Sequence, residues 1–442
     1  MNITKLSFHQ FRGIHEATLL CDPSLNVFVG NNGAGKSAVL DGLAMLLSWL
    51  LSRVADKNAH GQHMRDMDIS NGASVAKLEA WCQTSATTLP GSGSSSELYW
   101  RLVKSLSGRA QAKDSSDLQQ LNTYSAALRD AMRDSHGQTA LPLLVYYPVH
   151  RAVHDIPLRI RTKHSFDLLA AYDNALESGS DFRLFFEWFR EREDLENEML
   201  RRTLPLFGDP ALASHPLPDL ATFEDRQLQA VRRALAAFLP DFRNLTVRRK
   251  PLRMEVYKHG QLLRFEQLSD GEKCLIALIS DIARRLALAN PNQDPLQGAG
   301  VVLIDEVDLH LHPQWQRLLI SHLTEVFPRC QFFITTHSPH VLSHVQPHNV
   351  FMLERDHATV HVSKPTNSYG QSAEPILEDI MGLDTTRPFK VAEDLEAVFD
   401  SIAQGDWDEA RARIQALEAI LGQDPTLLRA KMLLRRKTSI RS

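Results

Sequence analysis

The residues best suited to chemistry form one short segment, Gly30 to Ser37, whose sequence GNNGAGKS has the spacing G-x-x-x-x-G-K-S. An apolar stretch before it predicts a buried strand, and an apolar-faced helix is expected over Ala38–Leu51. Phosphate binding requires a strand, a glycine loop and a helix in this order, because glycines let backbone N–H groups close around phosphate oxygens at a helix N-terminus. Lys36 would then reach the β- and γ-phosphates, and the Ser37 hydroxyl would ligate Mg²⁺. An ordinary glycine turn is the alternative, which this combination of elements disfavours.

A second group of reactive side chains follows the apolar stretch Val301–Ile304, which predicts a buried strand ending in Asp305 and Glu306. Apolar strands often end in acids, so the pattern is weak by itself. Downstream of a phosphate loop it indicates that Asp305 positions Mg²⁺ and that Glu306 polarises an attacking water molecule.

Two histidines, His310 and His312, follow these acids and stand beside Asp308, which raises the alternative of a metal site. Pro313 comes directly after them, and a proline there suits a turn into the next helix better than it suits zinc ligation. We therefore expect a turn.

Polar residues at two other places could face the same ligand. Ser269 and Glu272 have the spacing of a capping box, which predicts a helix N-terminus. The segment Thr336-His337-Ser338 follows a strand expected over Gln331–Thr335, and α/β sheets place ligand chemistry at such strand ends. His337 could sense a γ-phosphate there, or it could be a capping or core histidine.

The composition limits the class of protein. The chain has 442 residues, 43% of them hydrophobic, and a net charge of −4, which indicates a soluble globular protein of two or three domains. A strongly basic balance, which would point to nucleic acid, is absent. The four cysteines show no C-x-x-C spacing, so we expect free thiols in a reducing compartment. With neither a signal peptide nor a membrane-spanning segment expected, the predicted location is the cytoplasm.

The elements around these residues alternate in type. Further strands are expected at 2–9, 15–21, 74–84, 97–104, 141–148, 245–256, 349–353 and 359–362. Loops are expected at 87–96, 204–220 and 364–388. Helices are expected at 115–133, through much of 166–238, from 269 to 288, and at 390–402, 406–421 and 425–437.

Two of the helical segments contain patterns that predict how they pack. Phenylalanines recur at helical spacing from Phe182 to Phe189, which predicts a packed helical core rather than a ligand-stacking surface. The segment GDWDEAR at 405–411 resembles the start of one helical-hairpin repeat. A single hairpin cannot bury both of its faces, so we expect it to dock on the core that carries the phosphate loop or on a partner.

Taken together, six motifs resemble the ABC-type ATPases of the RecF/SMC/OLD group. They are FRG at 11–13, the P-loop, VYYPVHR at 145–151, LSDGEK at 268–273, VVLIDEVDLHLHP at 301–313 and TTHSP at 335–339. The resemblance implies an α/β fold, an ABC-type P-loop ATPase head with a helical insertion and a C-terminal helical hairpin region. The implied divisions are a P-loop lobe over 1–151, the insertion over 152–244, a second lobe over 245–365 and a partner-docking region over 366–442.

The resemblance also implies roles for individual residues. LSDGEK looks like the signature, with Asp270 where a glycine is usual, Asp308 lies in the D-loop, and His337 matches the switch histidine. From its sequence context alone, Arg12 could equally be a surface charge. In the resemblance it matches an arginine that touches nucleotide phosphates. The implied ATP-binding residues are Arg12, Asn31, Asn32, Gly33, Ala34, Gly35, Lys36, Ser37, Ser269, Asp270, Gly271, Glu272 and Asp308. Ser37 and Asp305 would hold Mg²⁺, and Lys36, Glu306 and His337 would act in hydrolysis.

One family motif is missing, and the expected assembly follows from the others. His150 and Arg151, not a glutamine, follow the strand that ends at Tyr147, so the Q-loop residue is unassigned.

In this group two copies stack head to tail, each ATP lying between one P-loop and the other copy's signature. An isolated chain would then hydrolyse ATP slowly, and a larger oligomer stays open.

A narrower resemblance comes from the segment at 166–198 and the C-terminal GDWDEAR, which look like the PtuA ATPases of Septu-type antiphage systems. Members also occur beside retrons. The family's partner is a separate HNH nuclease of the PtuB type, which the ATPase would control on sensing phage infection. DNA, or a retron's msDNA and reverse transcriptase, are further partners left open, and no membrane is implied. A RecF-like DNA-repair ATPase and a nucleotide-dependent scaffold with little turnover are the alternative functions.

Overall fold

The computed structural model describes residues 1–84, 96–106, 115–149, 166–176, 182–203, 224–356 and 359–441. The chain divides into two compact units, Met1–Ala373 and Glu374–Ser442. The loop predicted at 204–220, nearly all of the one at 87–96, and the pair His150-Arg151 lie outside the described residues.

A six-stranded sheet with the order β13-β12-β3-β11-β10-β6 forms the centre of the first unit. Its strands are β3 (Leu25–Val29), β6 (Leu143–Tyr147), β10 (Gly300–Ile304), β11 (Cys330–Thr335), β12 (Val350–Asp356) and β13 (Thr359–Ser363). All of them except β13 run parallel, and every residue of β3, β6, β10 and β11 is buried. Strands buried on both faces explain the continuous apolar runs in the sequence. Their carboxyl ends meet at one edge of the sheet.

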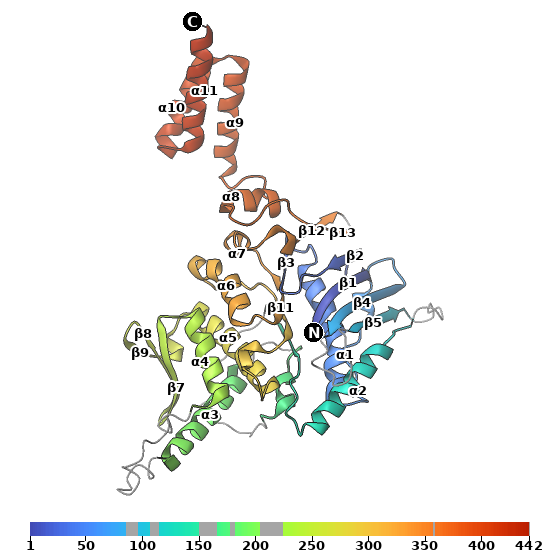
Figure 1. Cartoon of the computed structure of the whole chain (residues 1–442). Coiled ribbons are helices and arrows are strands. Elements are labelled where there is room, and N and C mark those ends of the chain that lie inside the picture. Colours follow the sequence, from blue (N-terminus) through green and yellow to red (C-terminus); the bar gives the residue numbers. More distant parts are fainter. Residues whose placement is uncertain are drawn as a thin grey trace. The chain divides into compact units, whose positions relative to one another are not determined.

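A second, antiparallel sheet has the order β2-β1-β4-β5 and lies with the long helix α1 on one side of the central strands (Figure 1). Its strands are β1 (Asn2–Phe11), β2 (Ile14–Leu20), β4 (Val75–Thr84) and β5 (Ser96–Ser105), accompanied by α1 (Lys36–Ala55) and α2 (Gln119–Asp134). Helix α1 approaches this sheet closely, because a Cβ added at Gly42 would lie 2.7 Å from the ring of Phe8. By length and composition α1 could cross a membrane, but 67% of its most apolar window is buried inside the structure, as in a core helix.

The helical part of the first unit contains α3, α4, α5 and a small antiparallel sheet, β7-β8-β9 (Figure 1). These elements are α3 (Phe182–Thr203), α4 (Arg226–Phe238), α5 (Asp270–Ala289), β7 (Phe242–Arg249), β8 (Leu252–Lys258) and β9 (Gln261–Arg264). The aromatic side chains of α3 are buried, which confirms the predicted packed core. The strand predicted at 245–256 is in fact two strands, since a turn at Lys250-Pro251 reverses the chain, and β7 already begins inside the segment assigned to the helical insertion.

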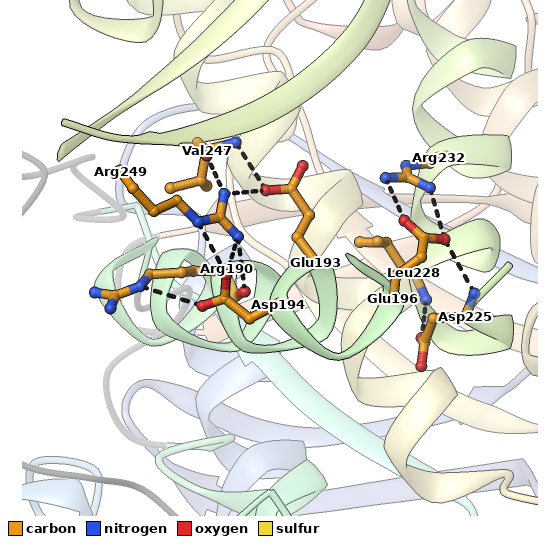
Figure 2. Close-up of polar contacts among 9 residues, drawn as sticks. All are labelled: Arg190, Glu193, Asp194, Glu196, Asp225, Leu228, Arg232, Val247 and Arg249. Carbon is orange, nitrogen blue, oxygen red and sulfur yellow. Dashed lines mark hydrogen bonds and ion pairs between the residues drawn. The ribbon is translucent and has the colours of Figure 1, made fainter. Parts of the chain in front are cut away.

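Carboxylates on α3 join this helix to its neighbours (Figure 2). Buried Glu193 accepts hydrogen bonds from the backbone N–H of Val247 at 3.0 Å and from Arg249 at 2.7 Å. One turn along, Glu196 receives a two-pronged contact from Arg232 of α4, at 3.1 and 3.0 Å. Ion pairs with this geometry fix the orientation of the helix as well as its position.

A fully buried polar cluster ties α5 to the central strand β6. Asp281 of α5 accepts hydrogen bonds from Arg284 and Arg285, each at 2.7 Å, and from the Tyr147 hydroxyl of β6 at 3.0 Å. Both arginines and the tyrosine have no exposed surface. The cluster links α5 to the sheet, and loss of one partner would leave a buried charge without compensation, which is costly.

Shorter elements complete the first unit and lead into the second. Helices α6 (Pro313–Val326) and α7 (Pro339–Leu342) follow β10 and β11, and the turn predicted before Pro313 is present, with Pro313 in the first turn of α6. Single helical turns are η1 (Asp66–Asp68), η3 (Leu168–Tyr172), η5 (Phe265–Gln267), η6 (Pro295–Gln297), η7 (Pro347–Asn349), α8 (Ala373–Pro375) and η8 (Ile376–Ile380). The last two lie in a stretch predicted as loop.

The second unit is a bundle of α9 (Phe389–Gln404), α10 (Trp407–Leu421) and α11 (Pro425–Arg441). The three helices share one core of nine buried residues: Leu395, Val398, Ile402, Ala410, Ile414, Leu417, Leu427, Ala430 and Leu434. The premise that the hairpin has nothing in the chain to pack against is therefore wrong, because the third helix shares its core, although Phe389 and Ile420 remain exposed. Docking on a partner stays a prediction.

Candidate nucleotide-binding site

The glycine loop has the backbone that phosphate binding needs. It connects β3 to α1, and Gly30 and Gly35 have φ values of 143° and 101°, which side chains with a Cβ rarely adopt. A Cβ at Gly30 would also lie 2.1 Å from the carbonyl oxygen of Leu353, so β12 packs against the loop. The side chain of Lys36 curls back over the loop, and its Nζ donates to the carbonyls of Gly30 at 2.9 Å and Asn31 at 3.1 Å.

The acids predicted to hold Mg²⁺ and water follow β10 at the same edge of the sheet. Asp305 is buried and accepts a short hydrogen bond from the hydroxyl of Thr335. The same hydroxyl accepts a hydrogen bond from the backbone N–H of Glu306 at 2.7 Å. Glu306 has a φ of 47°, a left-handed conformation that is uncommon for a residue with a side chain. Thr335, the last residue of β11, thus holds the turn at which the two acids diverge.

The predicted D-loop and switch residues are joined to each other. Asp308 accepts hydrogen bonds from the hydroxyl of Thr336 at 2.5 Å and from the backbone N–H of His337 at 3.4 Å. Burial, assisted by the positive charge of Lys36, lowers the pKa of His337 below its ordinary 6.5. The imidazole is therefore neutral at pH 7, and one nitrogen can accept a hydrogen bond.

Lys36 lies within electrostatic reach of the two acids after β10, Asp305 and Glu306. Burial lowers the pKa of Lys36, while the carboxylates of Asp305 and Glu306 act to raise it. Its hydrogen-bond acceptors in the loop are neutral carbonyls. A mostly buried ammonium in this position gains energy from an anionic phosphate oxygen.

The predicted signature residues form a helix cap next to the D-loop. Ser269 caps α5, and the Glu272 carboxylate accepts hydrogen bonds from the Ser269 backbone N–H at 2.8 Å and from its hydroxyl at 2.9 Å, which confirms the capping box. Burial would raise the pKa of Glu272, but hydrogen bonds from Lys258 and Ser269 hold it below its usual value. Gly271 has no room for a side chain, because a Cβ would lie 2.3 Å from the carbonyl oxygen of His310.

Arg12 is engaged with two carboxylates. Its Nε donates to Asp68 at 2.7 Å, and its Nη1 forms a short contact with Asp41 of α1. Asp41 also accepts a hydrogen bond from the hydroxyl of Tyr146 at 2.9 Å. This chain of contacts places Arg12 next to the first turns of α1.

Two family models match the chain. One, described as "AAA domain", matches residues 5–235. The other, described as "AAA domain, putative AbiEii toxin, Type IV TA system", matches residues 134–343. The Retron Vc95 probable ATPase of Vibrio cholerae serotype O1 biovar El Tor is 30% identical over 388 residues, covering 80% of this chain and 74% of the relative. The Retron Ec83 probable ATPase of Escherichia coli is 29% identical over 402 residues, covering 80% and 72%. The Septu protein PtuA of Bacillus thuringiensis is 39% identical over 131 residues, 28% of this chain and 33% of the relative.

The chain belongs to the PtuA-like ATPases of retron and Septu systems. The family resemblance read from the sequence is thereby confirmed. Among solved structures, the SMC head bound to the C-winged helix domain of ScpA matches with a TM-score of 0.47 and 16% identity, over 82% of this chain and 98% of that one.

The site of this PtuA-like ATPase fits Mg²⁺-ATP by its donor set. Ser37 is exposed beside Lys36 in the first turn of α1, and Asp305 directly follows β10, which β11 separates from β3 in the sheet. Hard oxygen donors of this kind are what Mg²⁺ prefers, the remaining positions being taken by phosphates and water. The predicted alternative of a histidine metal site gains no support, since no group of three His, Cys, Asp or Glu in the described part of the chain could hold a metal ion.

Several residues of this site were not predicted. Thr335 and Asp68 act through partners that are distant in sequence, so only the folded sheet identifies them. Tyr146 precedes the place where a Q-loop glutamine was expected, and burial together with Asp41 raises the pKa of its phenol, which stays protonated and donates. A hollow of about 640 Å³ between α4, β7 and β8 contains none of the predicted site residues.

Proposed function

We propose that this chain hydrolyses Mg²⁺-ATP between two copies of itself and uses this cycle, in antiphage defence, to control a separate HNH nuclease of the PtuB type. The observation that carries the hydrolytic part is the convergence of Lys36, Asp305 and His337 at one edge of the central sheet. The retron and Septu relatives support the defence role.

Each residue would have a distinct task. Lys36 and the loop N–H groups would bind the β- and γ-phosphates, while Ser37 and Asp305 would hold Mg²⁺. Glu306 would orient and deprotonate the attacking water, and neutral His337 would contact the γ-phosphate. Asp308, bonded to the backbone of His337, would sense that contact.

The second copy would supply the signature. Ser269, Asp270 and Gly271 lie at the N-terminus of α5, whose partial positive charge suits the γ-phosphate of an ATP bound to the partner subunit. A single chain would leave this end of the helix unused and would turn over slowly. The C-terminal bundle, which has a core of its own, would be the platform for the nuclease. DNA, or a retron's msDNA and reverse transcriptase, would join the same assembly in the cytoplasm.

The hydrolytic part is tested with Glu306→Gln. The amide keeps the shape of the side chain but cannot take a proton, so ATP should still bind and turnover should fall at least about 100-fold. Mass photometry with Mg²⁺-ATP should show a stable dimer that wild type forms only transiently. Glu266→Gln, an exposed acid before α5, is the matched control and should behave as wild type. Wild-type hydrolysis by Glu306→Gln would disprove the assignment of the base.

The partner is tested by mixing the chain with an HNH nuclease of the PtuB type, with and without ATP. We expect a mixed complex in mass photometry that is lost when residues 389–442 are deleted, while nucleotide binding by the deleted chain persists. A chain that binds no nuclease but binds DNA, with DNA-stimulated hydrolysis, would instead favour the RecF-like repair function. Assembly without measurable turnover would favour the scaffold.

A further inference from the structure

A second arginine, Arg355, lies beside the P-loop. Its Nη1 donates to the carbonyl oxygen of Gly33 at 3.2 Å. Its Nη2 is 3.6 Å from the position that a Cβ on Gly13 would occupy, in the turn that contains Arg12. One guanidinium group from the end of β12 therefore donates a hydrogen bond to the phosphate loop and lies next to the turn after β1.

The sheet explains why a residue so distant in sequence lies here. β12 runs parallel to β3, and the last aligned pair is Met352 with Val29. Beyond this pair β3 becomes the P-loop while β12 continues, with Leu353 against Gly30. Arg355 follows two residues later and so falls beside the tip of the loop. Side chains of a strand alternate between its faces, so the acids Glu354 and Asp356 point away from Arg355.

The two arginines differ in how their charges are used. Arg12 is neutralised by Asp41 and Asp68. Within the described ranges, exposed Arg355 forms no ion pair, and its hydrogen bond is to a neutral carbonyl. A guanidinium has five N–H donors, so four of those of Arg355 are available for a ligand. The planar arrangement of these donors matches the oxygens of a phosphate.

We propose that Arg355 binds a phosphate oxygen of the nucleotide held in the P-loop, as a positively charged contact additional to Lys36. The proposal rests on nucleotide binding at this loop. The contact forms with ATP and ADP alike, so it strengthens binding of substrate and of transition state to the same degree. Its removal should then change KM and leave kcat unchanged.

The test measures the affinity of the full chain for Mg²⁺-ATP, Mg²⁺-ADP and Mg²⁺-tripolyphosphate by isothermal titration calorimetry. Arg355→Ala should weaken all three about 10- to 100-fold, the range that a hydrogen bond between charged groups supplies. Arg355→Lys should lie between Ala and wild type, since the charge remains but the fork is lost. The melting temperature without nucleotide should not change, because the side chain is exposed.

Arg329→Ala is the matched control. Arg329 is an exposed arginine just before β11, at the opposite edge of the same sheet, and its removal should change none of the affinities. Unchanged affinity in Arg355→Ala would overturn the proposal. A loss for ATP with unchanged tripolyphosphate binding would also overturn it, because the contact would then be to the nucleoside. Lys36→Ala distinguishes failure of the Arg355 proposal from failure of nucleotide binding at the loop. If Lys36→Ala and Arg355→Ala both bind ATP as wild type does, the loop does not bind the nucleotide. If Lys36→Ala loses ATP binding and Arg355→Ala keeps it, only the role of Arg355 is wrong.

Discussion

At the scale of single residues, the site is defined by how charge is placed around Lys36. The ammonium has neutral carbonyls as hydrogen-bond acceptors, two carboxylates lie within electrostatic reach, and a neutral imidazole faces the same space. Such an arrangement accepts an anionic ligand without first having to break an ion pair. Arg12 differs, because its two carboxylate partners must be given up or shared when it contacts a phosphate.

The protonation of His337 leads to a prediction about pH. Its pKa is lowered by burial and by Lys36, so as the pH falls the imidazole remains neutral until the pH passes below 6.5. If neutral His337 accepts a hydrogen bond during hydrolysis, the acid limb of kcat/KM, which reports the free enzyme, should lie below pH 6.5. Turnover is measured with Mg²⁺ in excess, so that the substrate keeps its metal. His337→Gln should be slow and should lack this limb. An acid limb at or above pH 6.5, or one that survives in His337→Gln, would contradict the prediction.

How far the sequence predicted the site depends on the distance between interacting residues. The P-loop and the capping box at Ser269 are local patterns, because their residues contact neighbours a few positions away, and both are found as predicted. Thr335 and Arg355 were not predicted, since their importance arises only when β11 pairs with β10 and β12 pairs with β3. A threonine at the end of a strand or an arginine between two acids has no local signature.

At the scale of elements, buried carboxylates as well as apolar side chains connect the helices of the helical part. Helix α3 is amphipathic, yet Glu187, Glu193 and Glu196 are all buried on it. Each of the three has an arginine partner, on α3 itself, on β7 or on α4. Periodicity correctly predicted the helix but not these pairs. The dense run of charge that would ordinarily be a solvated face instead holds α3 against β7 and α4 (Figure 2).

The pair of neighbouring acids on α3 provides a test of this interpretation. Glu193→Ala leaves the buried N–H of Val247 without an acceptor and removes one partner of Arg249, which should lower the free energy of unfolding by about 2–4 kcal/mol. Asp194→Ala removes a half-exposed partner of the same arginine and should cost less than about 1 kcal/mol. Urea unfolding followed by circular dichroism measures both. Equal losses in the two variants would show that burial of Glu193 is irrelevant to its contribution.

At the scale of the whole molecule, the chain separates nucleotide chemistry from a bundle with its own core. All predicted site residues lie in Met1–Ala373, and the cluster around Leu417 lies entirely in Glu374–Ser442. The sequence predicted the three helices but not that they would close on one another. That outcome depends on Leu427, Ala430 and Leu434 of α11 all facing the groove between the other two helices.

Separate cores predict separate responses to mutation. Leu417→Ala opens a cavity in the bundle and should destabilise it by about 2–4 kcal/mol, as large-to-small core substitutions do. Hydrogen exchange of backbone amides in 389–441 should accelerate, while exchange in β3 and β11 and the affinity for Mg²⁺-ATP should stay as in wild type. Ile420→Ala, three residues along the same helix, is the control, because that side chain is 75% exposed. Its loss should change the free energy of opening, measured by exchange, by less than about 0.5 kcal/mol. Faster exchange in the central sheet or weaker ATP binding in Leu417→Ala would contradict this prediction, because the two units would then unfold as one. In that case the stability of the bundle would itself connect a bound nuclease to the nucleotide site.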